Sequence, residues 1–319
     1  QPTQCYLQSR TMHFNVLLIQ YWSLIIFKVI ITFAMLSVGA YLLINQQLTV
    51  GQFIASEIII ITTLSSIEKL IASLENVYDA FTSIEKLLKI SDRPKEKQGE
   101  IAFTYNANNI ELYKLTNMGF GFQEDISILK NINIVIQPNE KVCIMGNDGA
   151  GKSILLKILS GIYPNSSGSI LVNNVPIQNY TLDSIRDRIG LLTNKQDIFE
   201  GSILENITLG NDILIDTIYT TAAQIGLTDF LQQLPNSLDT KVQPFGNQLS
   251  TSAIEKILLL RLLVHEYDIM LMDEPWIRSE ANIRTKIIDY LLHQNNKAII
   301  VVSNDEEYAS KCDKIIYLN

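Results

Sequence analysis

Two long apolar stretches open the chain. The first, Val16–Ile44, contains one charged side chain, Lys28. As a helix it would be about 43 Å long at about 1.5 Å per residue, which exceeds the roughly 30 Å hydrocarbon core of a bilayer. The second, Val50–Leu64, contains only Glu57 and reaches spanning length when it continues to Leu74.

This pattern predicts two membrane helices, about 16–44 and 50–74, joined by a short uncharged turn. The alternative is a buried helical hairpin in a soluble protein, although few soluble helices are apolar on every face. Arg10 precedes the first span and six basic residues follow the second, whereas the turn has none. The positive-inside rule therefore predicts that both ends of the hairpin face the cytoplasm.

A heptad pattern continues the second stretch beyond the membrane. Its apolar positions alternate three and four residues apart: Ile67, Leu70, Leu74, Val77, Phe81, Ile84 and Leu88. Such a stripe is typical of a helix that packs against other helices. We expect one helix to run to residue 90, where Ser91-Asp92-Arg93-Pro94 ends it. Residues 1–90 are thus a partial transmembrane domain, and the polar residues 91–109 are an interdomain linker.

From Ile110 onward, short apolar runs alternate with helical patterns, which predicts an α/β domain over 110–319. Polar residues flank most of these runs, as expected for buried parallel strands. The expected strands are Ile132–Ile136, Val142–Met145, Ile189–Leu192, Ile269–Met272, Ile299–Val302 and Ile315–Leu318, with a helix at Ile154–Leu159.

The distribution of charge supports this division of the chain. Hydrophobic residues make up 47% of the 319 residues and charged residues 18%, with a net charge of −8. Residues 1–64 hold only three of the 58 charged side chains (25 basic and 33 acidic). An acidic chain without a basic cluster argues against nucleic acid as a partner. The three cysteines lie far apart and form no metal or disulfide pattern, and the start at Gln1 suggests a piece of a longer protein.

A phosphate-binding loop is the strongest chemical signal. The segment after the expected strand Val142–Met145 fits G-x-x-x-x-G-K-[ST] at every fixed position. Its residues are Gly146, Asn147, Asp148, Gly149, Ala150, Gly151, Lys152 and Ser153. The glycines allow backbone N–H groups to surround a polyphosphate at a helix N-terminus. We expect Lys152 to reach the β- and γ-phosphates and Ser153 to hold Mg²⁺.

A pair of carboxylates is the second signal. The apolar run Ile269–Met272 ends in Asp273 and Glu274. Asp273 is expected to bind Mg²⁺, a cation that prefers oxygen ligands, and Glu274 to polarise the attacking water. The alternative is that two acids after a strand only cap a helix, but the phosphate loop independently requires a Mg²⁺ partner.

Together these motifs resemble the ATP-binding cassette (ABC) transporters, of the exporter type with a membrane domain fused to the nucleotide-binding domain. The resemblance covers nearly the whole chain and rests on the order of the landmarks. After the phosphate loop come Phe199–Ile207, Leu234–Thr240, Leu249-Ser250 and the carboxylate pair. The implied fold is a transmembrane α-helical segment plus an α/β P-loop ATPase domain. The resemblance implies ATP contacts from Phe122, Ile154, Asn194, Ser250 and Asn304, and a Mg²⁺ contact from Asn194.

Several positions depart from the family pattern. The signature Leu-Ser-Gly-Gly-Gln is here Leu249-Ser250-Thr251-Ser252-Ala253. Asn194 stands for the family's glutamine and Asn304 for its switch histidine, and asparagine cannot carry a positive charge. Loss of one transition-state contact typically costs 10²–10³ in rate. Tight ATP binding with slow hydrolysis is therefore expected, with Lys152 and Glu274 as the catalytic residues. Thr251 and Ser252 retain hydroxyls that can cap a helix.

The resemblance also implies partners. Two cassettes of the family close on two ATP molecules, so the chain would pair with a second half-transporter, identical or different. The pair would lie in membrane lipid and export a substrate that the sequence does not identify. Two alternatives remain open. One is a regulatory cassette that binds ATP with little hydrolysis, and the other is a soluble ATPase whose N-terminal part only anchors it. Trp276 either belongs to the core or packs where two cassettes meet, and Lys28 either reaches the membrane surface or pairs within the helix bundle.

Overall fold

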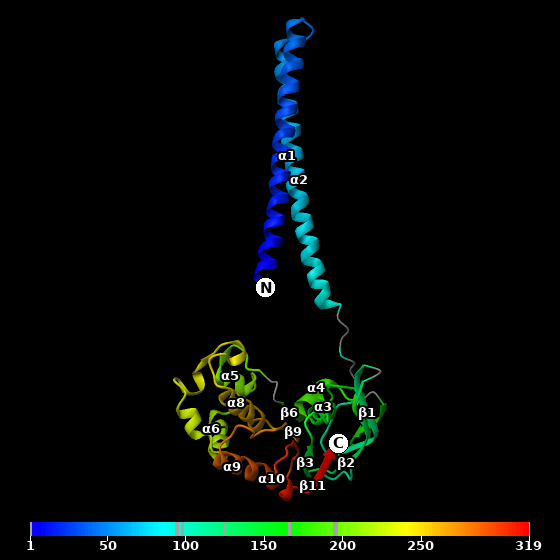
Figure 1. Cartoon of the computed structure of the whole chain (residues 1–319), viewed down its shortest axis with the longest axis vertical. Coiled ribbons are helices and arrows are strands. Elements are labelled where there is room, and N and C mark those ends of the chain that lie inside the picture. The colour runs from blue at the N-terminus through cyan, green and yellow to red at the C-terminus, as the bar shows by residue number, and fades with distance from the viewer. Residues whose placement is uncertain are drawn as a thin grey trace. The chain divides into compact units, whose positions relative to one another are not determined.

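The computed structural model describes residues 2–92, 96, 99–123, 126–164, 167–193 and 197–318. The chain divides into two compact units, Gln1–Lys95 and Glu96–Asn319 (Figure 1). The first unit consists of two long helices, α1 (Pro2–Ile44) and α2 (Val50–Ser91). The second is an α/β domain.

The helices of the second unit are short and most of them follow a strand. They are α3 (Lys152–Leu159), α4 (Leu182–Arg188), α5 (Ile203–Thr208), α6 (Ile215–Gln224), α7 (Thr228–Gln232), α8 (Thr251–Val264), α9 (Ala281–Leu292) and α10 (Glu306–Lys311). Three 3-10 turns each lie between a strand and a helix: η1 (Ile177–Asn179), η2 (Ser237–Asp239) and η3 (Pro244–Gly246).

The strands form three sheets. They are β1 (Tyr113–Gln123), β2 (Ile126–Ile136), β3 (Lys141–Gly146), β4 (Ser167–Val172), β5 (Val175–Pro176), β6 (Ile189–Leu192), β7 (Gly201–Ser202), β8 (Lys241–Val242), β9 (Ile269–Asp273), β10 (Ala298–Val302) and β11 (Lys314–Leu318). An antiparallel sheet has the order β2-β1-β4-β5, a parallel sheet has the order β11-β3-β10-β9-β6, and β7 pairs with β8.

The helical hairpin is closed by a capped turn and one close contact. Thr49 caps α2 in a capping box with Gln52, which satisfies two helix-end groups reciprocally. Gly39 is buried because the Phe53 ring lies against it, and a Cβ there would overlap the ring. Lys28 forms an ion pair with Glu68 of α2 at 3.1 Å. Of the two roles expected for Lys28, reaching the membrane surface or pairing within the helix bundle, the structure supports pairing.

Both helices are long and apolar enough to cross a membrane, over Tyr21–Ile44 and within Val50–Ser91. The first helix begins at Pro2 rather than near residue 16. No residue between breaks a helix, and proline is tolerated in the first turn. The second helix runs without interruption to Ser91, and its heptad side chains are 43–64% exposed. This apolar stripe is therefore available to helices from outside the described chain.

The core of the second unit lies around the parallel sheet. Every residue of β9 and β10 is buried, as expected for continuous apolar strands covered on both faces. The expectation of a buried strand is wrong for β11. It lies at the sheet edge, where Ile315 and Tyr317 are exposed. The sequence reading also missed β1 and most of β2, whose alternation is interrupted by four register shifts.

The linker predicted over residues 91–109 is too long. The boundary between the units lies at residues 95 and 96, and the chain joins the second unit soon afterwards. Gly99 and Ile101 donate backbone hydrogen bonds to Tyr180 and Asn179. Phe103 is buried, with its ring edge-on to Tyr180 at 5.3 Å. Backbone pairing and aromatic burial outweigh the polar composition that suggested a free segment.

The ammonium of Lys141 is buried at the amino-terminal ends of β3 and β10. Lys141 is 6% exposed and donates to the carbonyl oxygens of Asn139, Gln294 and Lys297, at 2.7–3.0 Å. Burial lowers the pKa of this group, against the charge of Asp313. The three carbonyls belong to the turns before β3 and β10, so one side chain ties both turns together.

We expect Lys141→Met to destabilise the second unit by about 2–3 kcal/mol, because it removes three hydrogen bonds from a charged donor to partly buried carbonyls. Urea unfolding of the full chain, followed by circular dichroism, measures this loss. Lys311→Met is the matched control, because its ammonium forms only an exposed ion pair with Glu307. Equal midpoints for the two variants would contradict the role assigned to Lys141.

Candidate functional site

The phosphate loop joins β3 to α3 in a backbone conformation that requires glycine. Gly146 and Gly151 have φ values of 151° and 85°. A Cβ at Gly146 would overlap the carbonyl oxygen of Leu318, and one at Gly151 would lie 2.7 Å from Leu129. No side chain caps α3, so its N-terminal amides remain for an anion.

Lys152 begins α3 and turns back over the loop. Its ammonium donates to the carbonyl oxygens of Gly146 and Asn147 at 2.6 and 3.0 Å. The side chain is 9% exposed and shares a cavity with Asp273 and Glu274. A phosphate that entered this cavity would offer Lys152 a stronger, charge-assisted partner than the two carbonyls.

The two carboxylates differ in their surroundings. Asp273 is the last residue of β9 and is 5% exposed. Glu274 follows in a left-handed conformation, φ 50°, and its N–H donates to Val302 at 2.9 Å. Burial, and second the charge of Asp273, raise the pKa of Glu274. Glu274 is therefore a stronger base than an ordinary glutamate, as suits a group that accepts a proton from water.

One cavity of about 380 Å³ brings most of the predicted residues together. Its lining contains the loop residues Asn147, Asp148, Gly149, Ala150, Gly151, Lys152, Ser153 and Ile154, together with Asp273, Glu274, Ile277 and Val302. The topology explains this convergence, because β3, β10 and β9 are parallel neighbours whose carboxyl ends lie at the same end of the sheet.

Asn304 follows β10 at the same end of the sheet. Its Oδ1 accepts a hydrogen bond from the N–H of Gly146 at 3.1 Å. Asn304, which stands for the family's switch histidine, is therefore hydrogen-bonded to the phosphate loop itself. Asn194 lies outside the described residues.

Phe122 lies apart from the residues that line this cavity. Its ring is 62% exposed and meets Phe120 and Tyr163 edge-on, at 5.1 and 5.7 Å. The adenine contact assigned to Phe122 stays a prediction. The aromatic cluster of Phe120, Phe122 and Tyr163 was not foreseen, because Tyr163 is distant in the sequence from the two phenylalanines.

The altered signature segment begins α8. Ser250 is the N-cap and accepts from Ala253 N at 3.2 Å. Thr251 and Ser252 lie inside the first turn, so the expectation that they cap the helix is wrong. The cap forms one residue earlier, where Ser250 has the extended backbone of a cap. Ser250 is absent from the lining of the phosphate-loop cavity.

A second cavity, of about 170 Å³, lies between the start of α8 and the end of β9. Thr251 and Glu255 line one side, and Asp273, Glu274 and Pro275 line another. Arg278 reaches across to Glu255. Asp273 and Glu274 therefore line two cavities, this one and the phosphate-loop cavity.

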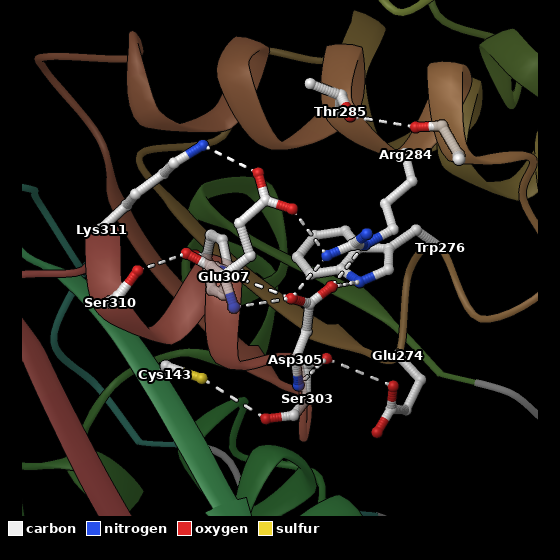
Figure 2. A network of polar contacts seen from close by, with 12 residues as sticks. Cys143, Glu274, Trp276, Arg284, Thr285, Ser303, Asp305, Glu307, Ser310 and Lys311 are labelled. Atoms are coloured by element: carbon white, nitrogen blue, oxygen red, sulfur yellow. Dashed lines mark hydrogen bonds and ion pairs between the residues drawn. The ribbon is translucent and has the colours of Figure 1, made fainter.

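Sequence reasoning missed a polar network behind Glu274 (Figure 2). Ser303 donates to Glu274 at 3.4 Å, and the Asp305 carboxylate accepts from Trp276 at 3.1 Å. Arg284 pairs with Asp305 through two hydrogen bonds of 2.5 and 2.7 Å. Trp276 is 4% exposed. Of the two places expected for it, the core or the surface where two cassettes meet, the structure supports the core.

The charge of Asp305 is held by this network. Burial pulls the pKa of Asp305 upward, but the Arg284 guanidinium and the amides of Tyr308 and Glu307 outweigh burial and lower it. The signal available in the sequence was Trp276 itself, a large aromatic residue two positions after the carboxylate pair.

The residues present fit Mg²⁺ and a polyphosphate. Ser153 and Asp273 supply a hydroxyl and a carboxylate oxygen to one cavity, which is the ligand chemistry that Mg²⁺ prefers. The described residues contain no cluster of three or more His, Cys, Asp or Glu side chains able to hold a metal. Phosphate oxygens and water would thus complete the coordination, as is usual for Mg²⁺.

Comparison with known proteins gives a consistent result. The ABC transporter family model matches residues 129–276. A probable ABC transporter ATP-binding/permease protein of Haemophilus influenzae is 28% identical over 88% of this chain and 51% of its own length. The lactococcin-G-processing and transport ATP-binding protein LagD of Lactococcus lactis is 24% identical over 92% and 42%.

A solved structure, of a bacterial Atm1-family ABC exporter with ATP bound, shares the fold. The TM-score is 0.78 at 22% identity, over 91% of this chain and 52% of that one. The chain spans about half the length of the relatives that it matches. With two apolar helices of spanning length, it is an integral membrane protein. Residues 129–276 therefore match the ABC transporter family, and the chain as a whole is similar to ATP-binding/permease proteins of this family.

Proposed function

We propose that the chain binds Mg·ATP in the phosphate-loop cavity and hydrolyses it slowly, to drive export of a substrate across the membrane. The observation that carries this proposal is the single cavity in which Lys152 and Ser153 meet Asp273 and Glu274. A cation, an uncapped helix N-terminus and a carboxylate pair in one cavity are what phosphoryl transfer to water requires.

Each residue has a role that its surroundings support. Lys152 would exchange its two carbonyl partners for β- and γ-phosphate oxygens. Ser153 and Asp273 would hold Mg²⁺, which neutralises charge that develops on the phosphates. Glu274, whose pKa is raised, would orient water and accept its proton. Asn194, Asn304, Ser250 and Phe122 remain proposed ATP contacts, and Asn194 a proposed Mg²⁺ contact.

Pairing with a second half-transporter completes the proposal. The signature segment at Ser250 is absent from the lining of the chain's own phosphate-loop cavity, so a second cassette would have to supply this contact. The apolar stripe of α2 between Ile67 and Leu88 is exposed in this chain and would bury itself against the other helices of the transporter. Movement of the cassettes would then reach the membrane through α2, with both cassettes in the cytoplasm.

Lys152→Ala should weaken Mg·ATP binding by about 10–100-fold, because charge-assisted hydrogen bonds to phosphate are lost. Displacement of a fluorescent ATP analogue from the full chain in lipid nanodiscs measures the affinity. Lys286→Ala, an exposed lysine of α9, is the control and should bind like the parent. Equal affinities for the two variants would rule out the assigned role of Lys152.

Glu274→Gln should keep the affinity for Mg·ATP within about threefold and lower kcat by 10²–10⁴-fold, the usual contribution of a general base. The pKa of Glu274 is raised in the folded state, so the ionised carboxylate destabilises the fold at neutral pH. The glutamine variant should therefore be at least as stable as the parent, which separates lost chemistry from unfolding. A stable variant with parental phosphate release would contradict the proposal.

Restoring the family glycines should speed turnover. In Thr251→Gly/Ser252→Gly, the start of α8 can approach a nucleotide held by a second cassette. We expect kcat to rise by about tenfold or more, the reverse of losing one transition-state contact. Each glycine in the first turn costs up to about 1 kcal/mol of helix stability, so the melting temperature should fall. Phosphate release at saturating Mg·ATP measures the gain, and an unchanged kcat would show that the signature does not limit turnover.

A further inference from the structure

Three consecutive residues after β10 each contact a different part of the site. Ser303 donates its hydroxyl proton to Glu274 Oε2 at 3.4 Å. Asn304 accepts from the N–H of Gly146 at 3.1 Å. Asp305 accepts from the indole of Trp276, two residues beyond Glu274. The short segment 303–305 therefore touches the base, the phosphate loop and the loop after β9.

Glu274 needs external support for its position. Its φ of 50° is unusual for a residue with a side chain, and such strain persists only where the surroundings determine it. One constraint is the hydrogen bond from its N–H to Val302. Beyond Glu274, Pro275 and Trp276 are buried, whereas Ile277 and Arg278 are exposed. Of the two buried residues, Trp276 has a polar group that can be held by a hydrogen bond.

Trp276 is anchored at both ends of its side chain. The ring packs edge-on against Tyr308 at 4.9 Å, and Tyr308 is fully buried. The indole N–H donates to Asp305 Oδ2 at 3.1 Å. Figure 2 shows Trp276, Arg284 and Asp305 facing one another, with Glu274 nearby and joined to Ser303 by a hydrogen bond.

Asp305 holds both ends of the loop that follows Glu274. Its carboxylate accepts from Trp276 and, through both oxygens, from Arg284 in the first turns of α9. The same carboxylate caps α10 through the amides of Glu307 and Tyr308. An Arg–carboxylate pair with two hydrogen bonds fixes orientation as well as distance.

We propose that Asp305 is a positioning residue, whose carboxylate clamps the loop bearing Glu274 to the loop bearing Asn304 and so holds Glu274 in its reactive position. The effect on turnover rests on the proposed function, whereas the clamp itself rests only on the contacts. The competing explanation is that Asp305 does no more than cap α10.

Asp305→Asn separates the two explanations. An asparagine keeps one oxygen to cap α10, but it lacks the charge and the second acceptor that bind Arg284 and Trp276. All variants carry Trp22→Phe, so that Trp276 is the only tryptophan of the chain. The full chain in nanodiscs is examined by tryptophan emission, acrylamide quenching and steady-state ATPase kinetics.

We expect Asp305→Asn to shift Trp276 emission to the red and to increase its quenching. We also expect kcat to fall by about tenfold, the effect of a small misplacement of a reacting group, with KM for Mg·ATP within twofold of the parent. Glu307→Gln is the matched control, because Glu307 also binds Arg284 but does not touch Trp276. This control should match the parent in emission and kcat.

A double variant tests whether Trp276 and Asp305 act together. Trp276→Phe keeps a ring against Tyr308 but loses the indole N–H. If the two residues form one clamp, Trp276→Phe/Asp305→Asn should have the kcat of Asp305→Asn alone. If the two substitutions acted independently, their effects on kcat would instead multiply, and that result would overturn the proposal.

Unchanged Trp276 emission in Asp305→Asn, or a kcat no lower than that of Glu307→Gln, would also overturn the clamp. A parent chain that does not bind Mg·ATP would refute the proposed function before any variant is compared, while the emission experiment would still decide whether the clamp exists. A parent that binds Mg·ATP without turnover would refute the positioning role and leave ATP binding standing.

Discussion

Parallel pairing of β3, β10 and β9 is the constraint on which the site depends. Val302 at the end of β10 lies in register with Ile144 of β3 on one side and with Asp273 of β9 on the other. Because the three strands run in one direction, the phosphate loop, the carboxylate pair and Asn304 emerge at the same edge. The buried strands thus fix the distances from the phosphate loop to two loops that lie more than a hundred residues later in the sequence.

Charges at this edge are kept in balance by polar partners. The ammonium of Lys152 is satisfied by two loop carbonyls, and the carboxylate of Asp305 by five hydrogen bonds. Glu274 has fewer partners and is partly buried beside Asp273, so its pKa is raised. The group assigned to chemistry therefore has few partners, whereas Lys152 and Asp305 are held by the framework.

The first unit follows a different physical rule. Its helices satisfy their own backbone hydrogen bonds and expose apolar side chains, as a bilayer requires. Lys28 and Glu68 pair within this apolar surface, which lowers the cost of placing either charge there. The close contact of Gly39 with Phe53 lets the two helices approach, in keeping with the small residues found where membrane helices meet.

The sequence alone determined the two apolar helices, the strands that carry the site, the phosphate loop and the carboxylate pair. These features depend on local pattern: a run of apolar residues, or glycines, a lysine and acids at fixed spacing. The tertiary structure alone decided that residues 99–109 join the second unit, and that Trp276, Arg284 and Asp305 form one network. Each of these depends on contacts between residues distant in the chain, which no local pattern encodes, because the energy of a hydrogen bond or a buried ring depends on the partner that the fold supplies.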